Sequence, residues 1–173
     1  FANVAFAAAV VGQPAPAFTL PDTNGKPVSL ADYKGKVVVL EWSNPGCPFV
    51  MKHYRSGNVP ALQKKYAKEV VWLTVNSTTN GHSDYMTGAQ LNDFNKQHGA
   101  APARYLLDVE GKVGRDYGAR TTPHMYIVDT SGKLAYVGAI DDIPSASEAD
   151  IKAAKNFVAA AIDEIKSGKA VSE

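Results

Sequence analysis

The sequence predicts an α/β fold in which helices cover both faces of a central mixed sheet. Three short apolar runs, at 37–40, 70–75 and 105–107, have the length of buried strands, and the first two are rich in β-branched residues. Helical patterns lie between them, and this alternation is typical of a layered α/β domain. Two further runs, at 126–129 and 134–137, are joined by a short polar turn and predict a closing hairpin.

A second hairpin is predicted ahead of this core. Asn24-Gly25 lies between short apolar runs at 18–20 and 27–30, and an Asn-Gly pair in that position favours a tight turn between strands. We therefore expect an N-terminal β-hairpin extension of the sheet domain.

Helices are predicted at 48–54, 60–68, 89–98 and 113–117, with a break around Gly57 between the first two. A final helix is expected from Ile151 to Ile165, because its apolar residues keep a 3.6-residue spacing. Ser147 and Asp150 resemble a capping box at its start, and Gly168 is expected to terminate it.

Length and composition indicate one domain, which we place at 12–168 with a short tail at 169–173. A chain of 173 residues with 45% hydrophobic and 20% charged residues can bury a sizeable core without disulfides or metal. The formal net charge is +1 and the basic residues are not clustered, so no nucleic-acid partner is expected. The oligomeric state is not indicated by the sequence.

Residues 1–11 are apolar and rich in alanine, like the end of a signal peptide. They predict export to the periplasm or another extracytoplasmic compartment, and the alternative is an extra N-terminal segment of a cytoplasmic protein. Eleven residues are too few to span a bilayer, which needs about 20. No transmembrane segment is therefore expected.

The candidate reactive group is Cys47, the only cysteine in the sequence. Asn44-Pro45-Gly46 interrupts the preceding strand, and Pro48 is suited to the first position of a helix. Cys47 should therefore lie at a helix N-terminus, where free N–H groups and the helix dipole favour a thiolate. The alternative is a buried cysteine that packs as a small inert side chain.

Thr122-Pro123-His124 precedes the closing hairpin and completes a recognisable pattern. Together with the segment 12–18 and with Cys47 after the first core strand, it resembles the thioredoxin-like redoxin superfamily. That superfamily includes the peroxiredoxins and the exported thiol-disulfide proteins. The resemblance implies a thioredoxin fold over about residues 12–166 and a cis-proline at Pro123 beside the thiol.

The resemblance also implies roles for several residues around the thiol. Thr122 would contact a bound partner through its backbone, and Glu41, six residues before Cys47, would be a buried acid that relays protons. Glu41 could instead be solvated at the end of its strand. His124 is a further candidate beside the substrate, and His53 could likewise assist the thiol. Asn44 could donate a hydrogen bond to a bound peroxide.

At two positions the sequence differs from the pattern of the superfamily, and these differences limit which redox reactions Cys47 could carry out. The position three residues after Cys47, where thioredoxins have a second cysteine, is Val50, so a dithiol cycle within this sequence is excluded. The position of the peroxiredoxin arginine is Pro123, and spacing does not show whether Arg115 or Arg120 replaces it.

Two redox functions and one other function therefore stay open. Cys47 could exchange mixed disulfides with glutathione or a client protein, or reduce a peroxide. The alternative is a binding module without redox turnover. No cofactor is expected, and no metal, because Cys47 with His53 or His124 lacks the ligand spacing of a metal site.

Overall fold

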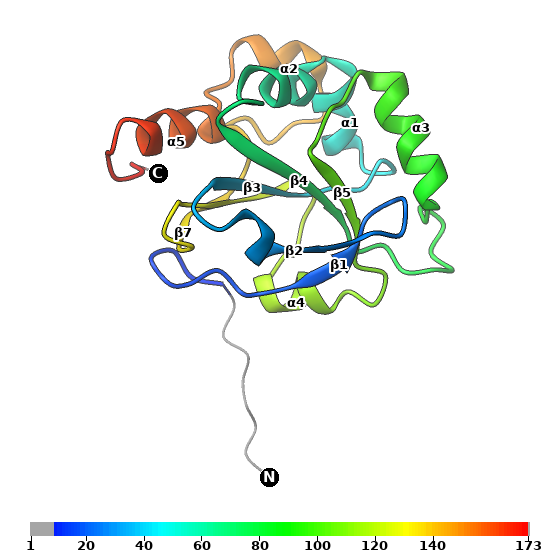
Figure 1. Cartoon of the computed structure of the whole chain (residues 1–173). Helices are drawn as coiled ribbons and strands as arrows, with labels where there is room; N and C mark the ends of the chain where they lie inside the picture. Colours follow the sequence, from blue (N-terminus) through cyan, green and yellow to red (C-terminus); the bar gives the residue numbers. More distant parts are fainter. Residues whose placement is uncertain (1–8, 173) are drawn as a thin grey trace.

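The structure is a computed structural model that describes residues 9–172 (Figure 1). Its main sheet has five strands in the order β5-β4-β3-β6-β7. These strands are β3 (Val37–Trp42), β4 (Val70–Asn76), β5 (Arg104–Leu107), β6 (His124–Val128) and β7 (Leu134–Gly138). Strands β3, β4 and β5 are parallel, whereas β6 and β7 run antiparallel to their neighbours. The predicted mixed sheet is confirmed.

Both faces of the sheet are covered, as Figure 1 shows. One face packs against α1 (Pro48–Arg55), α2 (Asn58–Lys65), α3 (Gly88–His98) and α5 (Phe157–Lys166). The other face packs against α4 (Lys112–Tyr117) and the N-terminal hairpin of β1 (Thr19–Pro21) and β2 (Pro27–Ser29), which leads into the 3-10 turn η1 (Leu30–Tyr33). The chain therefore has the expected thioredoxin-like layers and the expected hairpin extension.

The central strand β3 explains why the core has two halves. Successive strand side chains point to opposite faces. Val37 and Val39 accordingly join the core under α1, and Val38 and Leu40 join the core over α4. Every residue of β3 is buried, as expected for a strand covered on both faces.

Strand register brings three distant segments to one edge of the sheet. Parallel β3 and β4 align Trp42 with Val75, and antiparallel β3 and β6 align Trp42 with His124. The segments after β3, after β4 and before β6 therefore meet at the carboxyl ends of the parallel strands. In open α/β sheets this edge is where ligands bind.

The predicted start of the last helix is wrong. The segment 148–152 forms a separate 3-10 turn, η2 (Glu148–Lys152), and α5 begins only at Phe157. The Asn156 side chain caps α5 by accepting a hydrogen bond from the Ala159 N–H (2.8 Å). The Phe157 N–H donates instead to Ile140 O (3.0 Å), so a contact with the segment after β7 fixes the start of the helix.

The predicted signal-peptide remnant at 1–11 lies largely outside the described residues, because the description begins at Ala9. Export therefore stays a prediction from the sequence. Within residues 9–172, no helix has the length and apolar character needed to cross a membrane.

Candidate active site

Cys47 is the N-cap residue of α1, as its sequence context predicts. Its N–H donates to Asn44 O (2.9 Å), which closes the turn after β3, and Pro48 is the first residue of the helix. The Cys47 side chain is half-buried and packs partly against the core beneath α1. The sulfur therefore lies at a helix N-terminus without being sealed inside the core.

Thr122 and Pro123 lie directly beside this thiol. The Thr122-Pro123 peptide bond is cis, as the resemblance implies. The Cys47 thiol donates a hydrogen bond from Sγ to Thr122 O at 3.3 Å. Two segments 75 residues apart in sequence therefore form one site, and the Thr122 backbone is within reach of any group bound to the sulfur.

Glu41 is completely buried beneath α1, so it is not the solvated residue of the alternative prediction. Its carboxylate accepts hydrogen bonds from Tyr54 Oη (2.9 and 3.1 Å) and from Trp72 Nε1 (2.9 Å). Burial raises the pKa of Glu41 to about 7, although these two donors partly oppose the increase. No hydrogen bond within residues 9–172 joins Glu41 to Cys47. The acid is therefore near α1 but not in direct contact with the sulfur.

The Asn44 side chain stabilises the turn before Cys47. Its Oδ1 accepts a hydrogen bond from the Gly46 N–H (2.8 Å), and its Nδ2 donates to Asp84 Oδ2 (3.4 Å). Asp84 belongs to the loop after β4 and packs closely on Gly46, where a Cβ would lie 2.5 Å from Asp84 Cγ. The amide is thus committed to the turn and the loop, and no described contact directs it at the sulfur.

His124 lies on the opposite face of the sheet from α1. Its ring packs on the ring of Tyr126, with centroids 4.7 Å apart, and its Nδ1 is 3.2 Å from Tyr126 Oη. Partial burial lowers the pKa of His124. Tyr126 belongs to the core half over α4, whereas Cys47 packs against the half under α1. The structure therefore does not bring the His124 side chain to the thiol.

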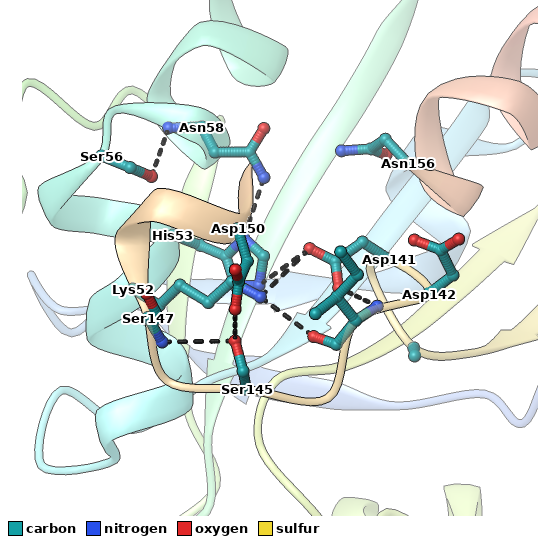
Figure 2. A network of polar contacts seen from close by, with 12 residues as sticks. Lys52, His53, Ser56, Asn58, Asp141, Asp142, Ser145, Ser147, Asp150 and Asn156 are labelled. Carbon is teal, nitrogen blue, oxygen red and sulfur yellow. Dashed lines mark hydrogen bonds and ion pairs between the residues drawn. The ribbon is translucent and has the colours of Figure 1, made fainter. Parts of the chain in front are cut away.

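A buried cluster of charged side chains, which sequence reasoning missed, joins α1 to the segment after β7 (Figure 2). Lys52 Nζ lies 3.5 Å from Asp141 Oδ2 and donates to Ile143 O (3.0 Å). His53 Nε2 lies 3.7 Å from the same Asp141 oxygen. We call Lys52, His53 and Asp141 the ionic cluster. All three are more than nine-tenths buried, so the ordinary preference of charged residues for the surface does not apply to them.

His53 is neutral in this cluster. Burial lowers its pKa to about 4, and the Lys52 charge acts in the same direction while the Asp141 charge opposes it. The Asn58 amide Nδ2 lies 2.8 Å from His53 Nδ1. An amide donor at Nδ1 places the imidazole proton on Nε2, facing Asp141. His53 is thereby engaged away from Cys47, so the structure does not place it at the thiol.

Two hollows flank the segment that carries Thr122. One has a volume of about 290 Å³ and is mainly apolar, with Phe49, Pro123, Ile140 and Ile143 in its walls and the ionic cluster at its base. The other, of about 430 Å³, is more polar and lies between this segment and the loop after β4. Within the described residues, no group of three or more His, Cys, Asp or Glu side chains could hold a metal ion.

Comparison with known families identifies the chain. The model of the AhpC/TSA family matches residues 11–137. The chain belongs to the AhpC/TSA family. It is 30% identical over 151 residues to the chloroplastic peroxiredoxin Q of Populus jackii, covering 74% of this chain and 69% of that protein. It is 29% identical over 141 residues to the thiol:disulfide interchange protein DsbE of Pseudomonas fluorescens, covering 78% and 70%.

A solved structure extends the similarity along almost the whole AhpC/TSA chain. A hypothetical protein of Sinorhizobium meliloti superposes with a TM-score of 0.80 at 24% identity, covering 96% of this chain and 89% of that one. At this identity the superposition shows the fold alone. The homologues of the chain therefore include both peroxiredoxins and thiol-disulfide oxidoreductases, and it differs from a dithiol protein by its single cysteine.

Sequence reasoning had little signal for the ionic cluster. Lys52 and His53 are adjacent polar residues on a helix that was predicted correctly, which would ordinarily place them on a solvated face. Their partner Asp141 is 88 and 89 residues away, in a segment without regular structure. Only the approach of this segment to α1 explains why the two residues are buried.

Proposed function

We propose that this AhpC/TSA protein is a thiol-dependent oxidoreductase that uses Cys47 for mixed-disulfide exchange. The observation that carries the proposal is the hydrogen bond from Cys47 Sγ to Thr122 O. It places a half-exposed sulfur at a helix N-terminus and beside the cis-proline segment. A helix N-terminus favours the thiolate, which is the nucleophile in disulfide exchange.

The proposed reaction needs only one cysteine. The Cys47 thiolate attacks one sulfur of a disulfide, a new bond forms between the two sulfurs, and the other sulfur leaves as a thiolate. A second thiol from solution then attacks the mixed disulfide and releases Cys47. The external thiol thereby becomes one half of a new disulfide, while the half of the original disulfide that left in the first step stays reduced. Glutathione and a client-protein thiol are the partners that this cycle would use.

Glu41 is proposed as a group that exchanges protons near the site, and not as one that touches the substrate. Its pKa of about 7 lets it gain or lose a proton near neutrality. Tyr54, which donates to Glu41, lies on α1, the helix that begins next to Cys47. The Glu41→Gln variant should therefore change how exchange depends on pH near 7 while leaving Cys47 reactive.

Peroxide reduction has less support. Polarising an O–O bond requires hydrogen-bond donors directed at the bound peroxide. The Asn44 amide is already directed at Asp84, and Pro123 occupies the position of the arginine that the resemblance would supply. Disulfide exchange requires neither of these groups.

Intact-mass analysis after separate treatment with oxidised glutathione and with dilute hydrogen peroxide would test the proposed function. We expect one glutathione adduct, absent from Cys47→Ser, which removes the sulfur but keeps a side chain of similar size. A rapidly formed sulfenic acid without exchange would favour a peroxidase instead. An unreacted protein, with alkylation of Cys47 no faster than that of an ordinary thiol at neutral pH, would show a binding module without redox turnover.

A further inference from the structure

The polar hollow lies beside the two segments that hold the Cys47 thiol, although Cys47 is not itself among its walls. Its walls come from the end of β3, the loop after β4 and the segment before β6, and include Asn44, Thr78, Thr79, His82, Arg120 and Thr122. Asn44 O and Thr122 O are the two acceptors of the hydrogen bonds that Cys47 donates. Both of these residues line the hollow, so a molecule held there would contact the two segments that hold the sulfur.

Arg120 is the one residue with a permanent positive charge in these walls. Its side chain is exposed, and within residues 9–172 it forms no hydrogen bond or ion pair. The nearby Arg115, by contrast, donates to Glu110 O (3.0 Å). An arginine without a partner presents a planar set of donors that matches a carboxylate.

Two acids that accept hydrogen bonds from wall residues are already engaged, and neither forms an ion pair with Arg120 within residues 9–172. Asp108 lies buried and is occupied by Ser77 Oγ (2.6 Å) and by the Gly114 N–H (2.8 Å). Asp84 lies against Gly46 and accepts from the Asn44 amide, at the side where Cys47 begins α1. The apolar hollow offers no comparable free cation, because Lys52 is paired with Asp141 and Ile143 O.

We propose that the polar hollow binds a small disulfide or thiol that carries a carboxylate, with Arg120 binding the carboxylate while Cys47 exchanges with the sulfur. This role depends on the disulfide exchange proposed above. The volume of about 430 Å³ is within the range of small-molecule sites and suits a molecule of tripeptide size. The Thr78 and Thr79 hydroxyls are further hydrogen-bonding groups in the same walls.

The bond changes are those of a single exchange. The S–S bond of the small disulfide breaks, a bond forms between Cys47 Sγ and one of its sulfurs, and the other half leaves as a thiolate. Arg120 takes no part in the electron transfer. It is a specificity residue that raises the rate for anionic disulfides over neutral or cationic ones.

Three disulfides of different charge would test this site. The rates of adduct formation at Cys47 are measured with oxidised glutathione, which is anionic, with bis(2-hydroxyethyl) disulfide, which is neutral, and with cystamine, which is cationic. Arg120→Gln should slow the reaction with oxidised glutathione by about tenfold, because a charge-assisted pair is lost. The rate with the neutral disulfide should not change.

Arg115→Gln is the matched control, because it removes the same charge from an exposed arginine that does not line the hollow. Equal slowing by the two substitutions would mean that only net charge matters, and would overturn the site. A wild-type protein that treats all three disulfides alike would also overturn it. In both cases reaction with the neutral disulfide would leave the proposed function standing.

A binding measurement separates the site from the chemistry. Reduced glutathione is titrated into the Cys47→Ser variant while backbone amide resonances are followed by NMR. Saturable shifts at 78, 79 and 120, lost in Cys47→Ser combined with Arg120→Gln, would support the site even if no disulfide reacted. Absence of such shifts at millimolar glutathione would refute it.

Discussion

Helix α1 contacts two buried regions that contain ionisable side chains. The two regions differ in how they accommodate groups that would be costly to bury with a charge. Under the helix, Glu41 is a single acid that receives hydrogen bonds from Tyr54 and Trp72 and has no cationic partner within residues 9–172. At the segment after β7, the ionic cluster pairs Lys52 with Asp141 beside a neutral His53. A lone buried acid becomes neutral by a raised pKa, whereas a mixed cluster keeps its charges by pairing them.

The difference also gives opposite responses to pH. Folded Glu41 holds its proton up to about pH 7, whereas an unfolded glutamate loses it near 4.5, so its contribution to stability falls as pH rises through this window. Folded His53 stays neutral down to about pH 4, whereas an unfolded histidine is protonated below 6.5. Its contribution to stability therefore falls as pH decreases through that window. Between about pH 4.5 and 6.5 the two effects oppose each other.

The largest expected effect is from breaking the ionic cluster. Asp141→Ala leaves Lys52 buried without its counter-ion, and we expect a loss of about 4 kcal/mol in the free energy of unfolding. Urea denaturation at pH 7 measures it. Asp142→Ala is the matched control, since Asp142 is the adjacent exposed aspartate and its Oδ1 accepts a hydrogen bond from the Lys155 N–H rather than pairing with Lys52.

A second variant tests the cause of that loss. In Lys52→Met combined with Asp141→Ala, no charge of the pair is left unpaired, so much of the lost stability should return. Additive losses in this double variant would contradict pairing as the role of the cluster.

Removing the lone acid comes next in size. Glutamine does not titrate, so Glu41→Gln removes the group that is protonated in the folded state between pH 4.5 and 7. The decrease of about 3 kcal/mol in the free energy of unfolding that Glu41 causes over this range should therefore disappear. Urea midpoints at several pH values would show the variant's stability rising with pH, as His53 alone dictates. A variant that follows the wild-type pH profile would mean that Glu41 is ionised throughout.

The complementary variant, His53→Gln, removes the titrating histidine instead of the acid. His53→Gln should lose the destabilisation that His53 causes between pH 6 and 4.5, which amounts to about 2 kcal/mol. Its stability should then decrease as pH rises, because the Glu41 effect is no longer opposed. The same series of urea midpoints measures this, and a pH profile identical to that of the wild type would rule out His53 as the titrating group.

The smallest effect concerns the partner of His53. Asn58→Ala removes the hydrogen bond at His53 Nδ1, and we expect a loss of about 1 kcal/mol, measured by thermal unfolding at pH 7. His53 should also protonate at a higher pH in this variant, because Nδ1 no longer faces an amide donor. An imidazole titration by NMR identical to that of the wild type would exclude the tautomer assigned to His53.

The comparison also shows how far the sequence could predict the site. Cys47 was predictable from a local signal, the helix start beside it, whereas the place of Pro123 beside the thiol was implied by the resemblance to the redoxin superfamily. The burial of Glu41 was one of two alternatives that the sequence left open, because an acid near the end of a strand can be buried or solvated. Asp141 was not predictable, because only the path of the chain after β7 brings it to Lys52 and His53.

The secondary structure likewise has elements that local sequence predicts and one boundary that depends on a contact from a distant part of the chain. The core strands follow from short apolar runs, and the break between α1 and α2 follows from Gly57. The start of α5 could not be found in this way, since the apolar stripe continues back to Ile151. The helix begins at Phe157 because Asn156 caps it and Ile140 O accepts the Phe157 N–H.

Gly46 affects the space available around the turn that carries Cys47. A methyl group at this position would come within 2.5 Å of Asp84 Cγ and 2.9 Å of Asp84 Cβ, so any larger residue must displace Asp84. Asp84 belongs to the same loop as Thr78 and Thr79, which form one wall of the polar hollow. The absence of a side chain at Gly46 therefore lets Asp84 pack on the turn before Cys47, and alanine there would push Asp84 and its loop away from that turn.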